Sequence, residues 1–267
     1  MAKGNDGNYL QHSIEIAIAL HLVAGTSGGR LHVALAHGMA PYEPCGALPD
    51  GQARRLLYES LEAARKPATE GESSIVAAYR ETNASLESYP NTGELLAAVI
   101  GRNRLSGGIT ETDTDKHANV QNVWSGSDVT PVAASWRCEV SSSGVLICPS
   151  SLRSPWLFSV DPMTYHEDGY ADDDKLYRAD LGRLSEMLKR YVASGQPGVA
   201  VFFVYGVKPD VRPQFWKFID DLAGQSGTLV VPCWIVHQGG NANLAALLCS
   251  PLVLRPAWLP HGLNFER

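Results

Sequence analysis

Apolar positions along the chain form short continuous runs that alternate with stretches of helical spacing. The runs LHVALA at residues 31–36 and GVAVFFVYGV at residues 198–207 are typical of central parallel strands, which are covered on both faces. Residues 179–194 and 210–224 have apolar residues at helical spacing, and Gly224 is expected to end the second helix. This alternation predicts a mostly parallel α/β sheet with helices on both faces.

The remaining segments complete this pattern. The stretch from Tyr9 to Val23 predicts a helix that is buried on more than one side. Further helices are expected at residues 51–66, 72–82, 93–101 and 115–124. Further strands are expected at GGITET (107–112), WLFSVDP (156–162), TLVVPCWIVHQ (228–238) and NLAALLCSP (243–251), with one more supplied by WRCEV or GVLIC between residues 125 and 155.

The chain shows no repeat and no convincing linker, so we expect one domain over residues 1–267, with a helical insertion at about 48–90 after the first strand. Hydrophobic residues make up 45% and charged residues 19%, an ordinary globular composition. No apolar run approaches the roughly 18 residues of a membrane span, and the N-terminal apolar stretch lacks a signal-peptide cleavage site. We therefore expect a cytoplasmic protein without a membrane partner.

Cysteine usage and net charge narrow the function classes. The 5 cysteines are an odd number without CxxC spacing, which disfavours both a disulfide framework and a zinc site. The formal charge of -6 gives no general attraction to nucleic acid. The acidic stretch HEDGYADDDK at residues 166–175 is typical of a solvated loop, and we expect no metal.

Polar residues that follow predicted strands are the candidates for chemistry, because ligands of parallel sheets bind at the carboxyl ends of the strands. Glu111 can accept hydrogen bonds from two ribose hydroxyls, or it can belong to a turn that caps the next helix. Asp161 follows a buried apolar run, so it either orients an amine in a cleft or caps a turn. Thr92 begins a helix that can bind a carboxylate, or it is a simple cap. His12 and His37 are ligand-contacting candidates or ordinary core histidines.

Several short motifs match known signatures in order from about Gly4 to Pro251. GNDGNYLQH at 4–12 is similar to a GNHADVLKH-like start, and AHGMAP is similar to a THAGAG-type first-strand end. YPNTG and ITET match a YPGSP-like helix start and a TEL-type strand end, and DPMTY at 161–165 stands for the DPPY signature. Together these motifs resemble the RlmJ-type family of ribosomal RNA adenine-N6 methyltransferases.

The resemblance implies a class I methyltransferase fold with a seven-stranded, mostly parallel sheet and S-adenosylmethionine as cofactor. It implies cofactor contacts for the positions that match the family's motifs, which are His12, His37, Thr92, Glu111 and Asp161. In the family the DPPY aspartate, here Asp161, also engages the target amine. Gln11 replaces a lysine of the family, the first-strand glycines are largely lost, and the second proline of DPPY is absent.

Three functions remain open from the sequence. The first is a methyltransferase acting on an amine of a nucleobase or small molecule, with Asp161 orienting the nucleophile and Tyr165 packing against its ring or cation. Net negative charge disfavours structured RNA as that acceptor, and the oligomeric state stays open. The second is a cyclase or lyase that consumes S-adenosylmethionine and releases methylthioadenosine. The third is a catalytically inactive, methyltransferase-like binding partner, which the eroded glycine motif favours.

Overall fold

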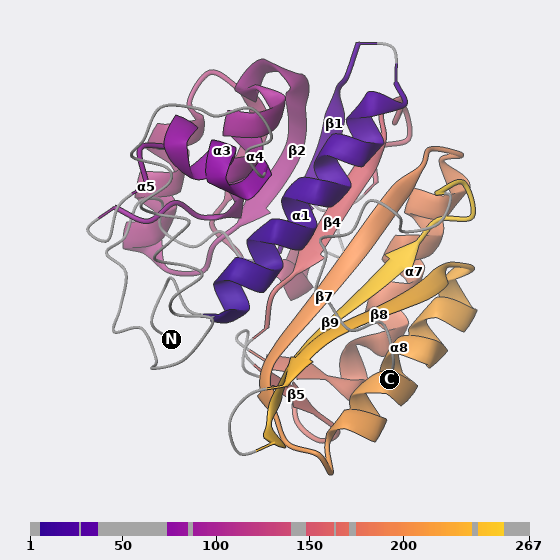
Figure 1. The fold of residues 1–267 in the computed structure, drawn as a ribbon. Coiled ribbons are helices and arrows are strands. Elements are labelled where there is room, and N and C mark those ends of the chain that lie inside the picture. Colours follow the sequence, from indigo (N-terminus) through magenta and orange to yellow (C-terminus); the bar gives the residue numbers. More distant parts are fainter. Residues whose placement is uncertain are drawn as a thin grey trace.

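The chain folds around one seven-stranded sheet in the computed structural model (Figure 1). The structure describes residues 6–26, 28–36, 74–84, 88–139, 148–162, 164–170, 175–236 and 240–253. The strand order is β3-β2-β1-β4-β7-β9-β8, with β9 antiparallel to both of its neighbours and the other pairs parallel. The strands are β1 (Leu31–Leu35), β2 (Leu105–Thr110), β3 (Asp128–Val132), β4 (Trp156–Val160), β7 (Gly198–Val207), β8 (Leu229–Val236) and β9 (Ala242–Cys249).

Helices connect these strands, and a small second sheet follows β4. The α-helices are α1 (Asp6–Ala24), α3 (Ser74–Glu81), α4 (Thr92–Ile100), α5 (Thr114–Trp124), α6 (Trp136–Glu139), α7 (Leu181–Ala193) and α8 (Arg212–Ser226). Two 3-10 turns are η1 (Arg102–Arg104) and η2 (Arg178–Asp180), and the second sheet pairs β5 (Thr164–His166) with β6 (Lys175–Tyr177) in parallel.

Helices cover both faces of the large sheet because its strands are apolar on both sides. Val33 and Leu35 of β1 pack into a core with α1, α4 and α5, whereas Ala34 between them packs into a second core with α7 and α8. Successive strand residues point to opposite faces, so a continuous apolar run fills two cores at once. The predicted three-layer α/β arrangement is confirmed.

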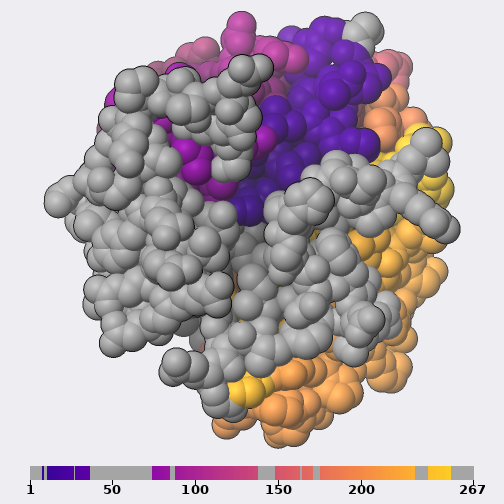
Figure 2. Space-filling view, in the orientation of Figure 1, coloured from indigo at the N-terminus to yellow at the C-terminus, as the bar shows by residue number. Residues whose placement is uncertain are grey.

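Helix α1 is buried on more than one side, as its sequence predicts. Ile14 and Ile18 join the core against the sheet, and Ile16 joins a separate cluster with α3 and α4. In the space-filling view, the indigo N-terminal segment lies between the magenta and orange parts of the chain (Figure 2). His21, in the last turn of the helix, is exposed. A helix in this position brings its buried polar residues into the middle of the molecule.

Two expectations about single elements need correction. Of the two segments expected to supply one more strand, WRCEV is wrong, because Trp136–Glu139 forms the short helix α6. The alternative, GVLIC at 144–148, lies outside the described residues except for its last residue. The third strand of the described sheet is β3 at Asp128–Val132. Gly224 does not end its helix, since α8 continues to Ser226 and ends at Gly227, which adopts a left-handed φ of 73°. Of the expected insertion, the helix at 51–66 lies outside the described residues, and the next one is α3.

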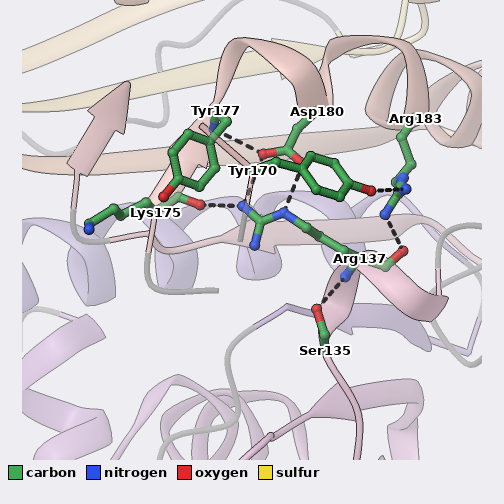
Figure 3. A network of polar contacts seen from close by, with 7 residues as sticks. All are labelled: Ser135, Arg137, Tyr170, Lys175, Tyr177, Asp180 and Arg183. Atoms are coloured by element: carbon green, nitrogen blue, oxygen red, sulfur yellow. Dashed lines mark hydrogen bonds and ion pairs between the residues drawn. The ribbon is translucent and has the colours of Figure 1, made fainter. Parts of the chain in front are cut away.

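A buried ion pair fastens α6 to the start of α7 (Figure 3). Arg137 donates from Nε to Asp180 Oδ1 at 2.8 Å and from Nη2 to Asp180 Oδ2 at 3.0 Å. Its guanidinium carbon also lies 4.4 Å from the ring centre of Trp136, and Asp180 Oδ2 accepts the Tyr177 amide at 2.9 Å. Each charge is thus paired in a fork geometry that suits burial.

In the part of the chain that the structure describes, no helix is both long enough and apolar enough to span a membrane.

Candidate functional site

The carboxyl ends of the central strands meet at one edge of the sheet. The neighbouring strands β2, β1 and β4 are parallel, so the residues that follow β2 and β4, Glu111 and Asp161, emerge on the same side. Thr110 Oγ1 donates to the carbonyl oxygen of Ala36 at 2.7 Å, which ties the ends of β2 and β1 together. This edge is the usual ligand-binding side of a parallel sheet.

A buried glutamate of α1 is the centre of the polar contacts at this edge. Glu15 has 0% exposure, and its Oε2 accepts a hydrogen bond from Thr92 Oγ1 at 2.7 Å. Its Oε1 accepts a hydrogen bond from the Oγ of Ser159, the next-to-last residue of β4. One carboxylate therefore joins α1, the first residue of α4 and the end of β4.

Asp161 is connected to the same group through Tyr205 and Gln11. The Tyr205 hydroxyl lies 2.6 Å from Asp161 Oδ1 and 3.0 Å from Gln11 Oε1, and it donates its single proton to one of them at a time. Gln11 Nε2 in turn donates to Thr92 Oγ1 at 3.5 Å. We call this set the edge network; its members are Gln11, Glu15, Thr92, Ser159, Asp161 and Tyr205.

Burial changes the acidity of the edge network. Removal from water, assisted by the nearby charge of Asp161, raises the pKa of Glu15 from 4.5 to about 7, although the hydrogen bonds from Ser159 and Thr92 act to lower it. Burial also raises the pKa of Asp161 from 3.8 to about 6, against the stabilising hydrogen bond from Tyr205. Among the described residues, no arginine, lysine or histidine pairs with either carboxylate. The edge network thus holds two acids without a cationic partner from those residues.

Glu111 lies beside a helix cap without being that cap. Asp113 caps α5, because its Oδ1 accepts the amides of Asp115 at 3.0 Å and Lys116 at 3.1 Å. Glu111 accepts the Asp113 amide through Oε1 at 2.9 Å, and partial burial raises the pKa of its carboxyl group. The capping role is therefore filled by a neighbour, and Glu111 keeps a partly exposed carboxylate at the end of β2.

Thr92 is the first residue of α4, and His12 of α1 contacts the segment that precedes this helix. Asn91 is the N-cap of α4, with Oδ1 accepting the Glu94 amide at 3.2 Å, so the Thr92 hydroxyl is free of capping and binds Glu15 instead. His12 is 4% exposed, and its Nδ1 lies 3.2 Å from the Tyr89 hydroxyl, which is 2.6 Å from the Tyr79 hydroxyl. His12 thus supports the turn before α4 from inside the fold.

Tyr165 is placed in the core, away from the polar contacts of the edge network. Its ring centre lies 5.8 Å from Phe215 and 5.4 Å from Phe218 of α8, and its hydroxyl donates to Glu167 Oε1 at 2.7 Å. In DPPY the tyrosine is the third residue after the aspartate, whereas Tyr165 is the fourth after Asp161. A shift of one residue in an extended segment turns a side chain to the opposite face. His37 lies outside the described residues.

Sequence reasoning did not identify Glu15, Ser159 and Tyr205, and it noted Gln11 only as a replacement. The available signal was Glu15 itself, a single acid within an apolar helix that is buried on several sides. A buried acid needs a partner or a ligand. The second partner, Ser159, is 144 residues away in sequence and comes into contact only through folding.

The strand order and the single antiparallel strand define a class I methyltransferase fold. No protein-family profile and no curated protein matches the chain.

Among solved structures, a Legionella pneumophila protein of family DUF519 is similar at a TM-score of 0.63 and 10% identity, over 93% of this chain and 87% of that one. A SAM-dependent methyltransferase of Leishmania major aligns at a TM-score of 0.40 and 10% identity, over 89% and 72%. A precorrin-6y C5,15-methyltransferase of Geobacter metallireducens aligns at 0.32 and 13%, over 80% and 98%. The first likeness is one of fold, and the other two scores are too low to carry any inference.

Proposed function

We propose that the protein binds S-adenosylmethionine at the carboxyl edge of its sheet and transfers the methyl group to an amine of a nucleobase or a small molecule. The observation that carries this proposal is the placement of Thr92, Glu111 and Asp161. Motif reasoning selected these three positions from separate parts of the sequence, and Thr92 and Asp161 belong to one hydrogen-bonded network. Glu111 follows the neighbouring strand on the same side of the sheet.

The residues at this edge fit the chemical groups of that cofactor. A ribose offers two hydroxyl donors, and the partly exposed carboxylate of Glu111 can accept both. The sulfonium and the α-amino group of its arm carry positive charge, which the two acids of the edge network can balance, since no described cation pairs with them. The α-carboxylate of the arm can lie at the start of α4, where Thr92 is. When bound, S-adenosylmethionine supplies an electrophilic methyl group. His12 supports the start of α4 in this scheme, and His37 is a further proposed contact.

Asp161 is the residue we assign to the acceptor amine. Its carboxylate is held by Tyr205, so an amine N–H can donate to it in a fixed orientation.

We propose a divergent relationship to the RlmJ-type family, with a smaller acceptor than structured RNA. The net charge of -6 and Gln11 in place of a lysine both reduce affinity for RNA. Because the ring of Tyr165 packs against Phe218 in the core, we do not assign it to the acceptor in this proposal.

The Asp161→Asn variant tests this assignment. Wild-type protein is incubated with S-adenosylmethionine carrying an isotope-labelled methyl group and with candidate amines, and the labelled product is measured. We expect the variant to reduce label transfer by at least about 100-fold, because the oriented carboxylate is lost. Cofactor affinity, measured by calorimetry, is expected to fall far less, by at most about tenfold.

Glu167→Gln is the matched control, because Glu167 accepts a hydrogen bond from Tyr165 in a different part of the fold. Equal label transfer by the wild type and Asp161→Asn would contradict the assigned role. Release of methylthioadenosine in the absence of any acceptor would instead establish the cyclase or lyase chemistry.

A further inference from the structure

Glu15 holds together the elements that carry the proposed cofactor contacts. Each of its two carboxylate oxygens accepts a hydrogen bond from one hydroxyl group, that of Thr92 of α4 or that of Ser159 of β4. Ser159 is two residues before Asp161, and Thr92 is the residue we assign to the cofactor. Replacement of Glu15 by an apolar residue would leave both hydroxyls without this acceptor inside the fold.

Glu15 and Asp161 also influence each other electrostatically. The negative charge of Asp161 disfavours ionisation of Glu15, and both negative charges disfavour ionisation of Tyr205. The pair therefore titrates as a unit, in which the second negative charge is harder to form than the first. A cation beside Asp161 reverses this preference, since it favours the ionised form of both acids.

Other titratable groups on the elements packed around Glu15 have their own partners. His12 of α1 binds Tyr89, and Glu94 of α4 accepts the Asn91 amide at 3.1 Å. His32 of β1 binds the Tyr191 hydroxyl at 3.1 Å. The other titratable side chains that the structure describes on these elements are His21 at the exposed end of α1 and Tyr79, Arg80 and Glu81 of α3. Among the described groups, Asp161 and Tyr205 are therefore those through which Glu15 responds to a ligand.

We propose that Glu15 is a positioning residue that shares one negative charge with Asp161, and that the positively charged arm of the cofactor makes this pair release a proton on binding. This inference rests on the proposed function. The cation is either the sulfonium or the amino group of the arm, and both carry the same consequence for the pair. Glu15 remains inside the fold and acts through Asp161, Thr92 and Ser159.

Calorimetry in two buffers of different protonation enthalpy counts the protons released on binding. The titrations are carried out at about pH 6.5, between the pKa values of the two acids. The three ligands are S-adenosylmethionine, S-adenosylhomocysteine and methylthioadenosine. The homocysteine compound lacks the sulfonium charge, and methylthioadenosine lacks the whole charged arm. We expect S-adenosylmethionine to release roughly 0.5 to 1 proton more than methylthioadenosine.

S-adenosylhomocysteine, which keeps the amino group and lacks the sulfonium charge, identifies which cation acts on the pair. Release by S-adenosylhomocysteine equal to that by S-adenosylmethionine assigns the amino group, and release equal to that by methylthioadenosine assigns the sulfonium. If all three ligands bind and release the same number of protons, the inference is wrong while the proposed function stands. If none of them binds, the proposed function is wrong and the inference falls with it.

Two variants of Glu15 and one control variant separate this role from a purely structural one. Glu15→Gln keeps the side-chain shape and one acceptor oxygen, and we expect it to lose at least half of the extra proton release. Glu94→Gln is the control, because Glu94 is also a buried glutamate and glutamine preserves its capping box. Glu15→Asp keeps a carboxyl group, and it should restore most of the release. Unchanged proton release in Glu15→Gln would overturn the role of Glu15.

Discussion

Two acids with no solvent exposure, Asp180 and Glu15, have opposite surroundings in this fold. Asp180 faces the guanidinium of Arg137 and the Tyr177 amide, so the chain itself balances its charge (Figure 3). Glu15 accepts hydrogen bonds from two neutral hydroxyl groups, and the nearby Asp161 adds a second negative charge. The first arrangement completes a structural joint, whereas the second has no cation from the described residues, and we propose that a ligand supplies it.

The location of each acid agrees with this difference. Asp180 lies in η2, where Arg137 fastens α6 to the start of α7, and it has no part in the edge network. Glu15 lies behind Asp161 and Thr92, at the carboxyl edge of the sheet. Ligand sites of parallel sheets lie at this edge, and functional sites are where unbalanced, perturbed acids are retained.

The largest expected effect comes from breaking the Arg137–Asp180 pair. Arg137→Met leaves a buried carboxylate without its cation, and we expect a loss of about 3 to 5 kcal/mol in the free energy of unfolding. Urea unfolding at neutral pH measures this loss. The double variant Arg137→Met with Asp180→Leu should recover most of the stability, since no lone charge then remains. A loss below about 1 kcal/mol in the single variant would contradict this expectation, because it would mean that the pair contributes no more to stability than a surface ion pair.

A smaller, pH-dependent effect of opposite sign is expected for Glu15→Gln. Because burial raises the pKa of Glu15 from 4.5 to about 7, the folded chain keeps a proton in this window that the unfolded chain releases. Wild-type stability therefore falls as the pH rises from 4.5 to about 7, and the full penalty is present above that range. The glutamine variant lacks this penalty, so its advantage should grow to about 3 kcal/mol.

Unfolding free energies of both proteins, measured across pH 4.5 to about 8, provide the test. The difference between the variant and the wild type should rise through this window and then level off. A difference that stays constant with pH would mean that the Glu15 carboxyl group titrates normally. Glu186→Gln, at an exposed position on α7, supplies the control for removal of one acid.

Buried apolar runs made most of the fold predictable. Residues 31–36 and 198–207 are short apolar runs between turn residues, and this length and these flanks favour strands that are covered on both faces. The third strand was missed because DVTPV is short, has mixed polarity and contains Pro131. Those properties are tolerated because β3 lies at the edge of the sheet, where one side of the backbone is unpaired. The position of an edge strand depends on tertiary pairing and is not encoded in local periodicity.

The candidate site was predictable only where a side chain directly follows a strand or begins a helix. Glu111, Asp161 and Thr92 meet this condition, and their positions follow from the topology of the sheet. Glu15 was missed because an acid within a helix is ordinarily assigned to solvent. The structure buries it because β4 and α4 pack against the same side of α1. Tyr165 was predicted at the site from its motif. The motif match did not take account of the one-residue offset after Asp161, which turns the side chain to the opposite face of an extended segment.

A crystal structure of the protein with S-adenosylhomocysteine tests the central claim most directly. The account predicts that the ribose hydroxyls contact Glu111 and that the aminobutyrate arm lies beside Thr92 and Asp161. A nucleoside bound elsewhere on the chain, or a carboxyl edge too closed to admit it, would contradict the account.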